Sequence, residues 1–447
     1  MDAARLNGLT ATETARQIAD GLLSSEDHVR ACLARVEETE PTVQAWAHLD
    51  AEFALEQARE ADLRRMRGLP CGPLHGVAVG IKDIIDVAGL PTEDGTVLHA
   101  GRLPRHDATV VSRLRASGAV ILGKTVTTEL ASYAPGRTRN PHDPEHTPGG
   151  SSSGSAAAVA AGQVPAALGS QTNGSIIRPA SFCGVYGFKP SFGLVPRGGV
   201  LRLSRALDHV GVLARSLEDV ALLAECIAGY DDDDPDTRPP RARPPLAAVL
   251  AQEPPMPPKL ALVRTPFWDR LDADARGAFE ELAESLGSHA EPFELPESAA
   301  LAVDWHRTIF EADLAASFEL EYERGAEKLS ASMRSQIERG RQVTAVDYQK
   351  ALARIEIVSA GFDELFARFD AIVTPATLGT APKGLAATGD PLPATLWTYC
   401  GMPAASLPLA HGENGLPLGI QLVGARGDDA RLLRTARWLC TAVTAAA

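Results

Sequence analysis

Two clusters of glycine and serine contain the residue types most able to do chemistry in this chain. They span residues 149–155 and 169–175, and the Ala/Val-rich run between them predicts a buried helix. Glycine permits positive φ and close approach of another atom, and serines 151–153 could cap the first amides of that helix. A serine needs a base within hydrogen-bond reach to become a strong nucleophile. Neither cluster contains a histidine, so the base has to come from elsewhere.

Lys82 is the natural candidate for that base. In the segment 76–89, GVAVGIKDIIDVAG, large and small apolar residues alternate with the period of a strand, so Lys82 shares a face with Ala78 and Gly80. A lysine exposed at the end of a strand would explain the same pattern without any chemistry. The catalytic interpretation requires a central strand and a buried amine, because burial lowers the lysine pKa from about 10.4 and yields the neutral base.

Two further motifs predict other chemistry, and their surroundings argue against both. Residues 142–146, HDPEH, match the HxxEH pattern of inverted zinc proteases, but Pro144 disfavours the helix that would bring both histidines together. We therefore predict a solvated loop and no metal site. Residues 150–154, GSSSG, match the nucleophile elbow of α/β-hydrolases, which requires an apolar strand directly before it. The preceding PHDPEHTPG is no such strand, so an esterase using Ser152 is a minor alternative.

The longer motifs resemble the amidase signature family, the Ser–cisSer–Lys amidases. The resemblance rests on GIKD at 80–83, GGSSSGSAAAVAAG at 149–162 and GSQTNGSIIRPASFCG at 169–184. It continues in ALDHVGVLARSLED at 206–219, GMPAASLPL at 401–409 and GLPLGIQLVG at 415–424. Nearly the whole chain is covered, apart from a Pro-rich segment and a charged helical segment.

This resemblance implies a catalytic triad and its supports. Ser175 matches the nucleophile that forms the acyl-enzyme, and Ser151 matches the serine held through a cis peptide. Lys82 matches the lysine that takes and returns the proton through that serine, and Ser170 matches a supporting Ser/Thr position. The oxyanion hole corresponds to the backbone amides of Thr172, Asn173, Gly174 and Ser175. Loss of one donor from such a hole typically costs about 10²–10³ in rate. No metal or organic cofactor is implied.

The chain departs from the family pattern at three positions beside the nucleophile. Gln171 stands where many members carry Asp, Asn173 where many carry a second Gly, and Arg178 lies three residues after Ser175 instead of two. This variant resembles malonamidase-like members that act on small acidic amides, in which the arginine pairs with the substrate carboxylate. Arginine suits planar, bidentate carboxylate binding. Arg178 could equally brace its own loop, and both interpretations stay open.

The same motifs leave two rivals to a stand-alone amidase. The main rival within the resemblance is the A subunit of a glutamyl-tRNA amidotransferase, which makes ammonia from glutamine for a partner. That protein usually carries a substrate-binding Asp upstream of its GxPA segment, and here only Asp390 is available, out of clean register. The other rival is a non-catalytic scaffold, which would have no reason to retain Lys82, Ser151 and Ser175 together. We therefore favour a stand-alone amidase acting on a small-molecule amide.

The elements that position these residues alternate between strands and helices, which is typical of α/β folds. We predict one domain over residues 1–447, with a mixed, twisted central sheet and helices on both faces. A second helix should end before Pro41. The Pro/Asp-rich stretch 231–258 predicts a surface excursion, because such a composition cannot build a packed core. Residues 300–370 predict a charged helical insert.

The composition of the chain excludes some classes of binding partner. The chain has 447 residues and a formal net charge of −14, which argues against nucleic acid and anionic membrane surfaces as partners. No apolar run is long enough to span a bilayer, and the N-terminus lacks the pattern of a secretory signal. Six scattered cysteines predict free thiols in the cytoplasm. A homodimer is compatible with this sequence but nothing in it requires one.

Overall fold

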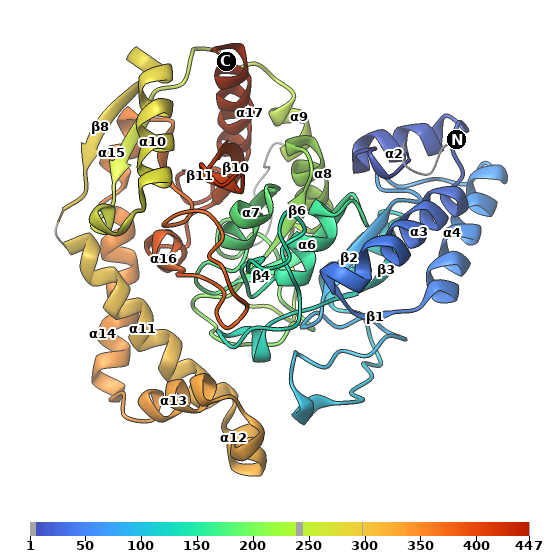
Figure 1. Cartoon of the computed structure of the whole chain (residues 1–447), viewed down its shortest axis with the longest axis horizontal. Coiled ribbons are helices and arrows are strands. Elements are labelled where there is room, and N and C mark those ends of the chain that lie inside the picture. Colours follow the sequence, from blue (N-terminus) through green and yellow to red (C-terminus); the bar gives the residue numbers. More distant parts are fainter. Residues whose placement is uncertain (1–5, 238–244, 297, 447) are drawn as a thin grey trace.

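A single eleven-stranded sheet runs through the computed structural model, which describes residues 6–237, 245–296 and 298–446 (Figure 1). In spatial order the strands are β1 (Trp46–Leu49), β3 (Val120–Thr125), β2 (Ala78–Lys82), β4 (Ala166–Gln171), β6 (His209–Ala214), β5 (Tyr186–Lys189), β10 (Ala404–His411), β11 (Pro417–Val423), β9 (Ala371–Pro375), β7 (Leu260–Arg264) and β8 (Ala290–Glu294). β2 is parallel to β3 and β4, whereas β4 is antiparallel to β6. The predicted mixed α/β sheet is confirmed.

Helices pack on both faces of this sheet, as predicted. One face carries α3 (Ser25–Val43), α4 (Ala51–Met66), α6 (Ser153–Ala160) and α7 (Ile177–Cys183). The other carries α5 (Thr109–Ala116), α8 (Leu217–Ile227), α9 (Leu246–Leu250) and α17 (Asp429–Ala446). The other α-helices among the described residues outside the segment 298–368 are α2 (Ala11–Ala19), α10 (Ala273–Leu286) and α16 (Leu392–Tyr399). Apolar side chains of both layers meet the strands, so the core lies on either side of the sheet.

The pleat of β2 decides where Lys82 lies. Ala78 packs with residues of α3 and α6, whereas Val79 and Ile81 pack with the opposite layer. Side chains two residues apart share a face, so Lys82 lies on the α6 side. Small residues make this approach possible: a Cβ on Gly154 of α6 would come within 2.2 Å of the Ala45 carbonyl oxygen. The helix that follows the first Gly/Ser cluster therefore packs tightly against the strand ends.

The structure differs from the sequence prediction at some element boundaries. Helix α3 continues through Pro41 to Val43 and ends at Gln44, which has a left-handed backbone with φ 53°. A proline in the last turn removes only one hydrogen bond, which is why it does not stop the helix. The second Gly/Ser cluster is also partly regular, because residues 169–171 complete the interior strand β4.

The Pro/Asp-rich stretch 231–258 combines exposed and buried residues, as far as the structure describes it, and the surface excursion stays a prediction. Asp234 and Thr237 are buried, and Asp234 forms an ion pair with Arg197. Helix α9 buries Leu246 and Leu250 in the core beside α8 and α17. Paired carboxylates and two leucines thus offset a composition that is poor in apolar residues. Part of the stretch, 238–244, lies outside the described residues.

Residues 298–368 form a group of helices on one side of the molecule. They are α11 (Ser298–Ser317), α12 (Glu319–Gly325), α13 (Ala331–Gly340), α14 (Ala345–Ala360) and α15 (Asp363–Arg368). Figure 1 shows α12 and α13 at the end of this group, away from the sheet. Helix α11 also packs on α16, which brings it beside the second Gly/Ser cluster. None of the helices described is long and apolar enough to cross a membrane.

Candidate active site

Lys82 ends β2 and is fully buried. Its Nζ lies 2.7 Å from Ser151 Oγ and 2.7 Å from Ser170 Oγ, so the structure brings together three residues that the sequence singled out. Burial lowers the lysine pKa well below its usual value, the carboxylate of Asp208 opposes this, and the cation of Arg178 adds to it. Desolvation dominates, which favours the neutral amine.

The first serine cluster is held by contacts other than helix capping. The peptide bond between Gly150 and Ser151 is cis. Helix α6 has no side-chain cap bond at its start, so the predicted capping by serines 151–153 is wrong. The hydroxyl of Ser151 bonds Lys82, and that of Ser153 donates to the Val126 carbonyl. These hydroxyls thus bond partners at the strand ends instead of the first amides of the helix.

A tight turn over residues 172–175 joins β4 to α7, and its carbonyl groups are held by other parts of the chain. The Thr172 oxygen accepts from His306 Nε2 at 2.8 Å, and the Asn173 oxygen accepts from Thr398 Oγ1 at 2.5 Å. The Gly174 oxygen accepts from the Arg178 amide at 2.9 Å. Burial holds the His306 pKa at about 4, so this imidazole is neutral at ordinary pH.

The amides of the same turn are free. Within the described part of the chain, the backbone N–H groups of residues 172–175 donate to no protein acceptor. The next two amides, of Ile176 and Ile177, both donate to Gln171 Oε1, at 2.8 and 3.0 Å. Buried amides without an acceptor are rare in folded proteins. Four in succession, next to the 8% exposed Ser175, form a site ready for a ligand oxygen.

The side chain of Asn173 is fixed as firmly as the turn. Its Nδ2 donates to Tyr133 Oη at 3.0 Å, and its Oδ1 accepts from Thr395 Oγ1 at 2.7 Å. Sequence reasoning missed Tyr133, His306 and Thr395, which lie on three distant segments. The spacing of Thr395 and Thr398 on one face of α16 was the only local signal for any of them.

Asp208 is a second charged group that sequence reasoning missed, although it lies in the 206–219 motif. Its carboxylate accepts from Thr172 Oγ1 at 2.7 Å and from the amides of Leu203 and Ser204 at 2.9 and 3.0 Å. Desolvation raises its pKa to about 6, against the effect of these hydrogen bonds. Asp208 therefore ties the start of the turn to the segment before β6 and carries charge at neutral pH.

Arg178 is buried and bonds the first serine cluster. Its Nη2 donates to the Gly150 carbonyl at 2.7 Å and to Thr388 Oγ1 at 3.2 Å, and its Nη1 donates to the Gly389 carbonyl at 3.0 Å. Nε is buried with no partner among the described residues. Burial lowers the guanidinium pKa to about 10, so the group stays cationic at neutral pH. These contacts favour the bracing interpretation over the carboxylate-binding one.

The two competing motifs have other partners. Ser152 is buried, donates to the Ser170 carbonyl at 3.1 Å, and accepts from the Ser170 amide at 3.2 Å. In the loop 142–146, His142 Nε2 donates to the Cys183 carbonyl at 3.0 Å, while His146 pairs with Asp143 at 2.9 Å. The described residues hold no group of three or more His, Cys, Asp or Glu that could bind a metal ion.

Two cavities border the turn through different residues. One has a volume of about 1010 Å³, and its lining includes Ser170, Thr172 and Asp208. The other has a volume of about 740 Å³, and its lining includes Asn173 and Tyr133. Both volumes are within or near the range of small-molecule sites.

Known proteins are similar to this chain in sequence and in fold. The Amidase family profile matches residues 27–433. The chain is 35% identical over 468 residues to the A subunit of glutamyl-tRNA(Gln) amidotransferase from Chloroflexus aurantiacus, covering 96% of this chain and 95% of that protein.

Solved structures agree over the full length. One, from a vestigial protein complex described as revealing the evolutionary origins of an s-triazine catabolic enzyme, has a TM-score of 0.91 at 30% identity over 97% of this chain and 98% of that chain. The native peptide amidase of Stenotrophomonas maltophilia has a TM-score of 0.85 at 28% identity over 97% of this chain and 96% of that chain. The chain therefore belongs to the amidase family and is a hydrolase that acts on C–N amide bonds.

Proposed function

We propose that this hydrolase cleaves small-molecule carboxamides through an acyl-enzyme on Ser175, with Lys82 as the general base acting through Ser151. The observation that carries the proposal is the buried Lys82 amine, whose Nζ lies 2.7 Å from the hydroxyls of Ser151 and Ser170. It lies near a turn with four amides that bond no acceptor among the described residues. The direct test is release of ammonia or amine from a panel of amides by the purified protein. Failure to hydrolyse any member, with a folded protein, would contradict the proposal.

The hydrogen bond between Lys82 and Ser151 provides one link of the proposed proton path. The step from Ser175 to Ser151 is carried over from the family resemblance. The hydroxyl of Ser175 loses its proton to Ser151 while Ser151 passes its own to the neutral Lys82 amine, and the Ser175 oxygen bonds to the carbonyl carbon. When the C–N bond breaks, the proton returns through Ser151 to the leaving nitrogen. Water then repeats the cycle on the acyl-enzyme, releasing the carboxylic acid and restoring the Ser175 hydroxyl. Ser170 acts as a positioning residue, since it contacts Lys82 rather than the reacting atoms.

The amides of Thr172, Asn173, Gly174 and Ser175 serve as the oxyanion hole in this proposal. Carbonyl groups of the turn are already bound by other parts of the protein, so the peptide groups need no reorganisation when charge develops on the substrate oxygen. Burial strengthens each donor, because water competes less in a low-dielectric site.

Gln171→Leu should lower kcat by about 10- to 100-fold and reduce the unfolding midpoint. The change leaves the Ile176 and Ile177 amides without their acceptor, and each buried unpaired group costs about 1–3 kcal/mol. The matched control is Gln171→Glu, which keeps the acceptor oxygen and should lose less of both quantities. Steady-state kinetics and thermal melting measure the two effects. Equal losses in both variants would mean that the acceptor does not hold the turn.

A stand-alone amidase is favoured over a glutaminase that serves a partner. Asp390, the only candidate for a substrate-binding Asp, pairs with Arg270 at 2.6 Å and accepts from the Leu392 amide at 2.9 Å. Its carboxylate is thus already engaged by protein. The glutaminase stays the second candidate because the relative from Chloroflexus aurantiacus belongs to an amidotransferase. Including glutamine in the amide panel separates the two.

Arg178→Met should lower kcat/KM for acidic and neutral amides by the same factor, on the order of tenfold to a hundredfold. The reason is that the guanidinium holds the Gly150 carbonyl beside Ser151, and a hydrogen bond to a charged group is worth about 1.5–3 kcal/mol. The measurement compares a half-amide of a short diacid with its neutral analogue. A loss confined to the acidic substrate would support the carboxylate-binding role instead.

In this proposal, the site binds a small-molecule amide as its substrate, and neither a nucleic acid nor a membrane takes part. A homodimer and a cytoplasmic location stay predictions, the latter from the cysteine pattern described above. Size-exclusion chromatography with light scattering tests the first, and fractionation of the producing cells tests the second.

A further inference from the structure

The imidazole of His306, in helix α11, holds the peptide group that carries one of the free amides of the turn. This group joins Thr172 to Asn173. Its carbonyl end accepts from His306 Nε2 at 2.8 Å, and its N–H end bonds no acceptor among the described residues. A carbonyl oxygen only accepts hydrogen bonds, so Nε2 carries the proton. His306 is 2% exposed, and burial holds its pKa at about 4, so the donor is a neutral imidazole that places no charge beside the turn.

The hydroxyl of Thr398, in helix α16, holds the next peptide group of the turn in the same way. This group joins Asn173 to Gly174. Its carbonyl end accepts from Thr398 Oγ1 at 2.5 Å, and its N–H end is likewise without an acceptor in the described part of the chain. Thr398 is fully buried, and its oxygen accepts from Gln171 Nε2 at 2.9 Å. Two successive free amides thus belong to peptide groups whose carbonyl ends are held by distant helices.

We propose that His306 and Thr398 are positioning residues of the oxyanion hole, which act on the substrate through the peptide groups that they hold. This inference rests on the proposed function. A hydrogen bond to the carbonyl end polarises a peptide group and strengthens donation from its N–H end. The same bond fixes the direction of the N–H before charge develops on the substrate oxygen. Because His306 lies in α11, the helical segment 298–368 then contributes to catalysis and not only to the fold.

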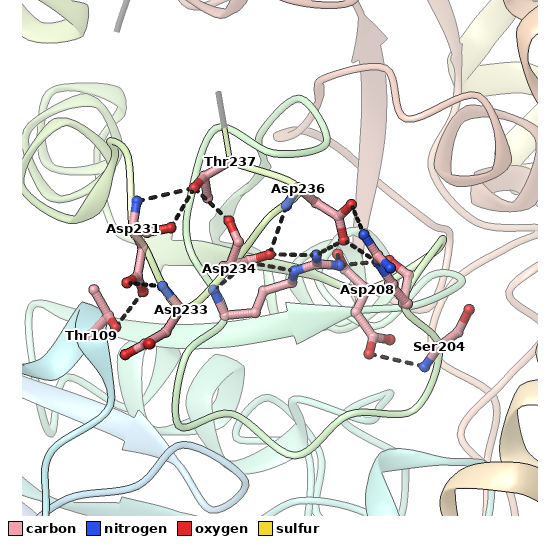
Figure 2. A network of polar contacts seen from close by, with 10 residues as sticks. Thr109, Ser204, Asp208, Asp231, Asp233, Asp234, Asp236 and Thr237 are labelled. Atoms are coloured by element: carbon pink, nitrogen blue, oxygen red, sulfur yellow. Dashed lines mark hydrogen bonds and ion pairs between the residues drawn. The ribbon is translucent and has the colours of Figure 1, made fainter. Parts of the chain in front are cut away.

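The side chains of the turn are anchored separately from its peptide groups. Thr172 Oγ1 donates to the Asp208 carboxylate at 2.7 Å, and Figure 2 shows this carboxylate with the Ser204 amide that donates to it at 3.0 Å. Asn173 Oδ1 accepts from Thr395 Oγ1 at 2.7 Å. These bonds keep the turn attached to the fold when one of its carbonyl groups loses a donor. Loss of such a donor should therefore disturb the direction of an amide more than the stability of the protein.

Matched substitutions separate the donor from the space that it fills. His306→Leu removes the N–H and keeps an apolar side chain of similar volume, whereas His306→Gln keeps an N–H donor at a similar distance from the backbone. Thr398→Val removes the hydroxyl and keeps the shape, whereas Thr398→Ser keeps the hydroxyl. Ile309→Val shortens a fully buried side chain three positions further along α11 and is the control for a general loosening of that helix.

The kinetic test uses the amide that the wild type hydrolyses fastest. His306→Leu and Thr398→Val should each lower kcat about 10- to 100-fold and change KM less than threefold. This loss lies below the roughly 10²–10³-fold cost of removing a donor from the hole, because the amide itself remains. His306→Gln and Thr398→Ser should recover at least half of the loss on a logarithmic scale. Ile309→Val should lower the unfolding midpoint and change kcat less than threefold.

Labelling by a fluorophosphonate provides a second readout of the same hole. The reagent bonds its phosphorus to the Ser175 oxygen and releases fluoride, and negative charge develops on the P=O oxygen during the attack. The second-order rate constant of labelling should therefore fall in the same order of variants as kcat. A merely structural role would lower the unfolding midpoint or the fraction of protein that reacts, and would leave the rate constant of the folded protein unchanged.

Equal losses of kcat in the apolar and the conservative variant at both positions would overturn the inference. So would a rise in KM with kcat unchanged, or losses no larger than that of Ile309→Val. If one apolar variant does not fold, the pair of variants at the other position decides. If the wild type hydrolyses no amide and no fluorophosphonate labels Ser175, the proposed function itself fails. That result differs from failure of the inference alone, in which the wild type is active and the variants match it.

Discussion

Ser175→Ala should reduce kcat for amide hydrolysis by about 10⁴–10⁶-fold and leave the fold unchanged. The substitution removes the attacking oxygen. The turn around it stays held by the Gln171 side chain and by Thr398, neither of which bonds the lost hydroxyl. Loss of one oxygen from a residue that is 8% exposed creates almost no cavity, so the unfolding midpoint should match that of the wild type. Steady-state kinetics and thermal melting measure these quantities.

Covalent labelling provides the control for this prediction. A fluorophosphonate should label Ser175 in the wild type, and mass spectrometry of the digested protein identifies the position. Ser152→Ala is the matched control, because the described partners of the Ser152 hydroxyl are the backbone groups of Ser170, so this hydroxyl should not be needed for labelling. A label on Ser152 would support the α/β-hydrolase alternative and contradict the mechanism proposed above.

The sequence could place residues within one element, where the alternation of side chains along a strand shows which residues share a face. The alternation in 76–89 put Lys82 on the small-residue face of a strand, and the structure has it there, buried and bonded to Ser151. The α/β class followed from the same kind of local pattern. Motif resemblance added Ser151 and Ser170, which local periodicity alone did not connect to the lysine.

Contacts between distant segments could not be placed in this way. His306 reaches the Thr172 carbonyl across 134 positions, and Thr395 reaches Asn173 across 222. Nothing in the local sequence of α11 indicates the first bond, and the spacing of Thr395 and Thr398 in α16 shows only that the two hydroxyls share a face. Their partners depend on how the helices dock. The contacts of Arg178 depend likewise on residues 388 and 389, in a loop with no regular pattern. The sequence could thus predict that these elements form, but it could not predict how they pack against one another.

Lys82→Met should reduce kcat about as much as Ser175→Ala does, since groups that act as a unit are not additive. Methionine keeps most of the side-chain length but cannot accept a proton. The double variant Lys82→Met/Ser175→Ala should therefore lose little more activity than either single variant. The values of kcat for the wild type, the two single variants and the double variant form a double-mutant cycle that tests this expectation. Near-full activity of Lys82→Met across pH would remove lysine from the mechanism.

The pH dependence of kcat/KM distinguishes a catalytic lysine from a merely structural one. Only the neutral amine accepts a proton, so kcat/KM should fall on the acid side as Lys82 becomes protonated, and burial moves this limb to lower pH. Asp208→Asn removes a carboxylate that stabilises the ammonium form, so the limb should move to still lower pH. Arg178→Met removes a cation that disfavours the ammonium form of Lys82, so the acid limb should move to higher pH.

The shift from Asp208→Asn requires an ionised carboxylate in the wild type. Because the Asp208 pKa is about 6, the shift should be full where the limb lies above that pH and should shrink below it. Thr172→Val offers a comparison, because it removes the hydrogen bond to Asp208 without removing the charge. It should change kcat while leaving the limb closer to its wild-type position than Asp208→Asn does. Identical profiles in all these variants would mean that the acid limb reports a group other than Lys82.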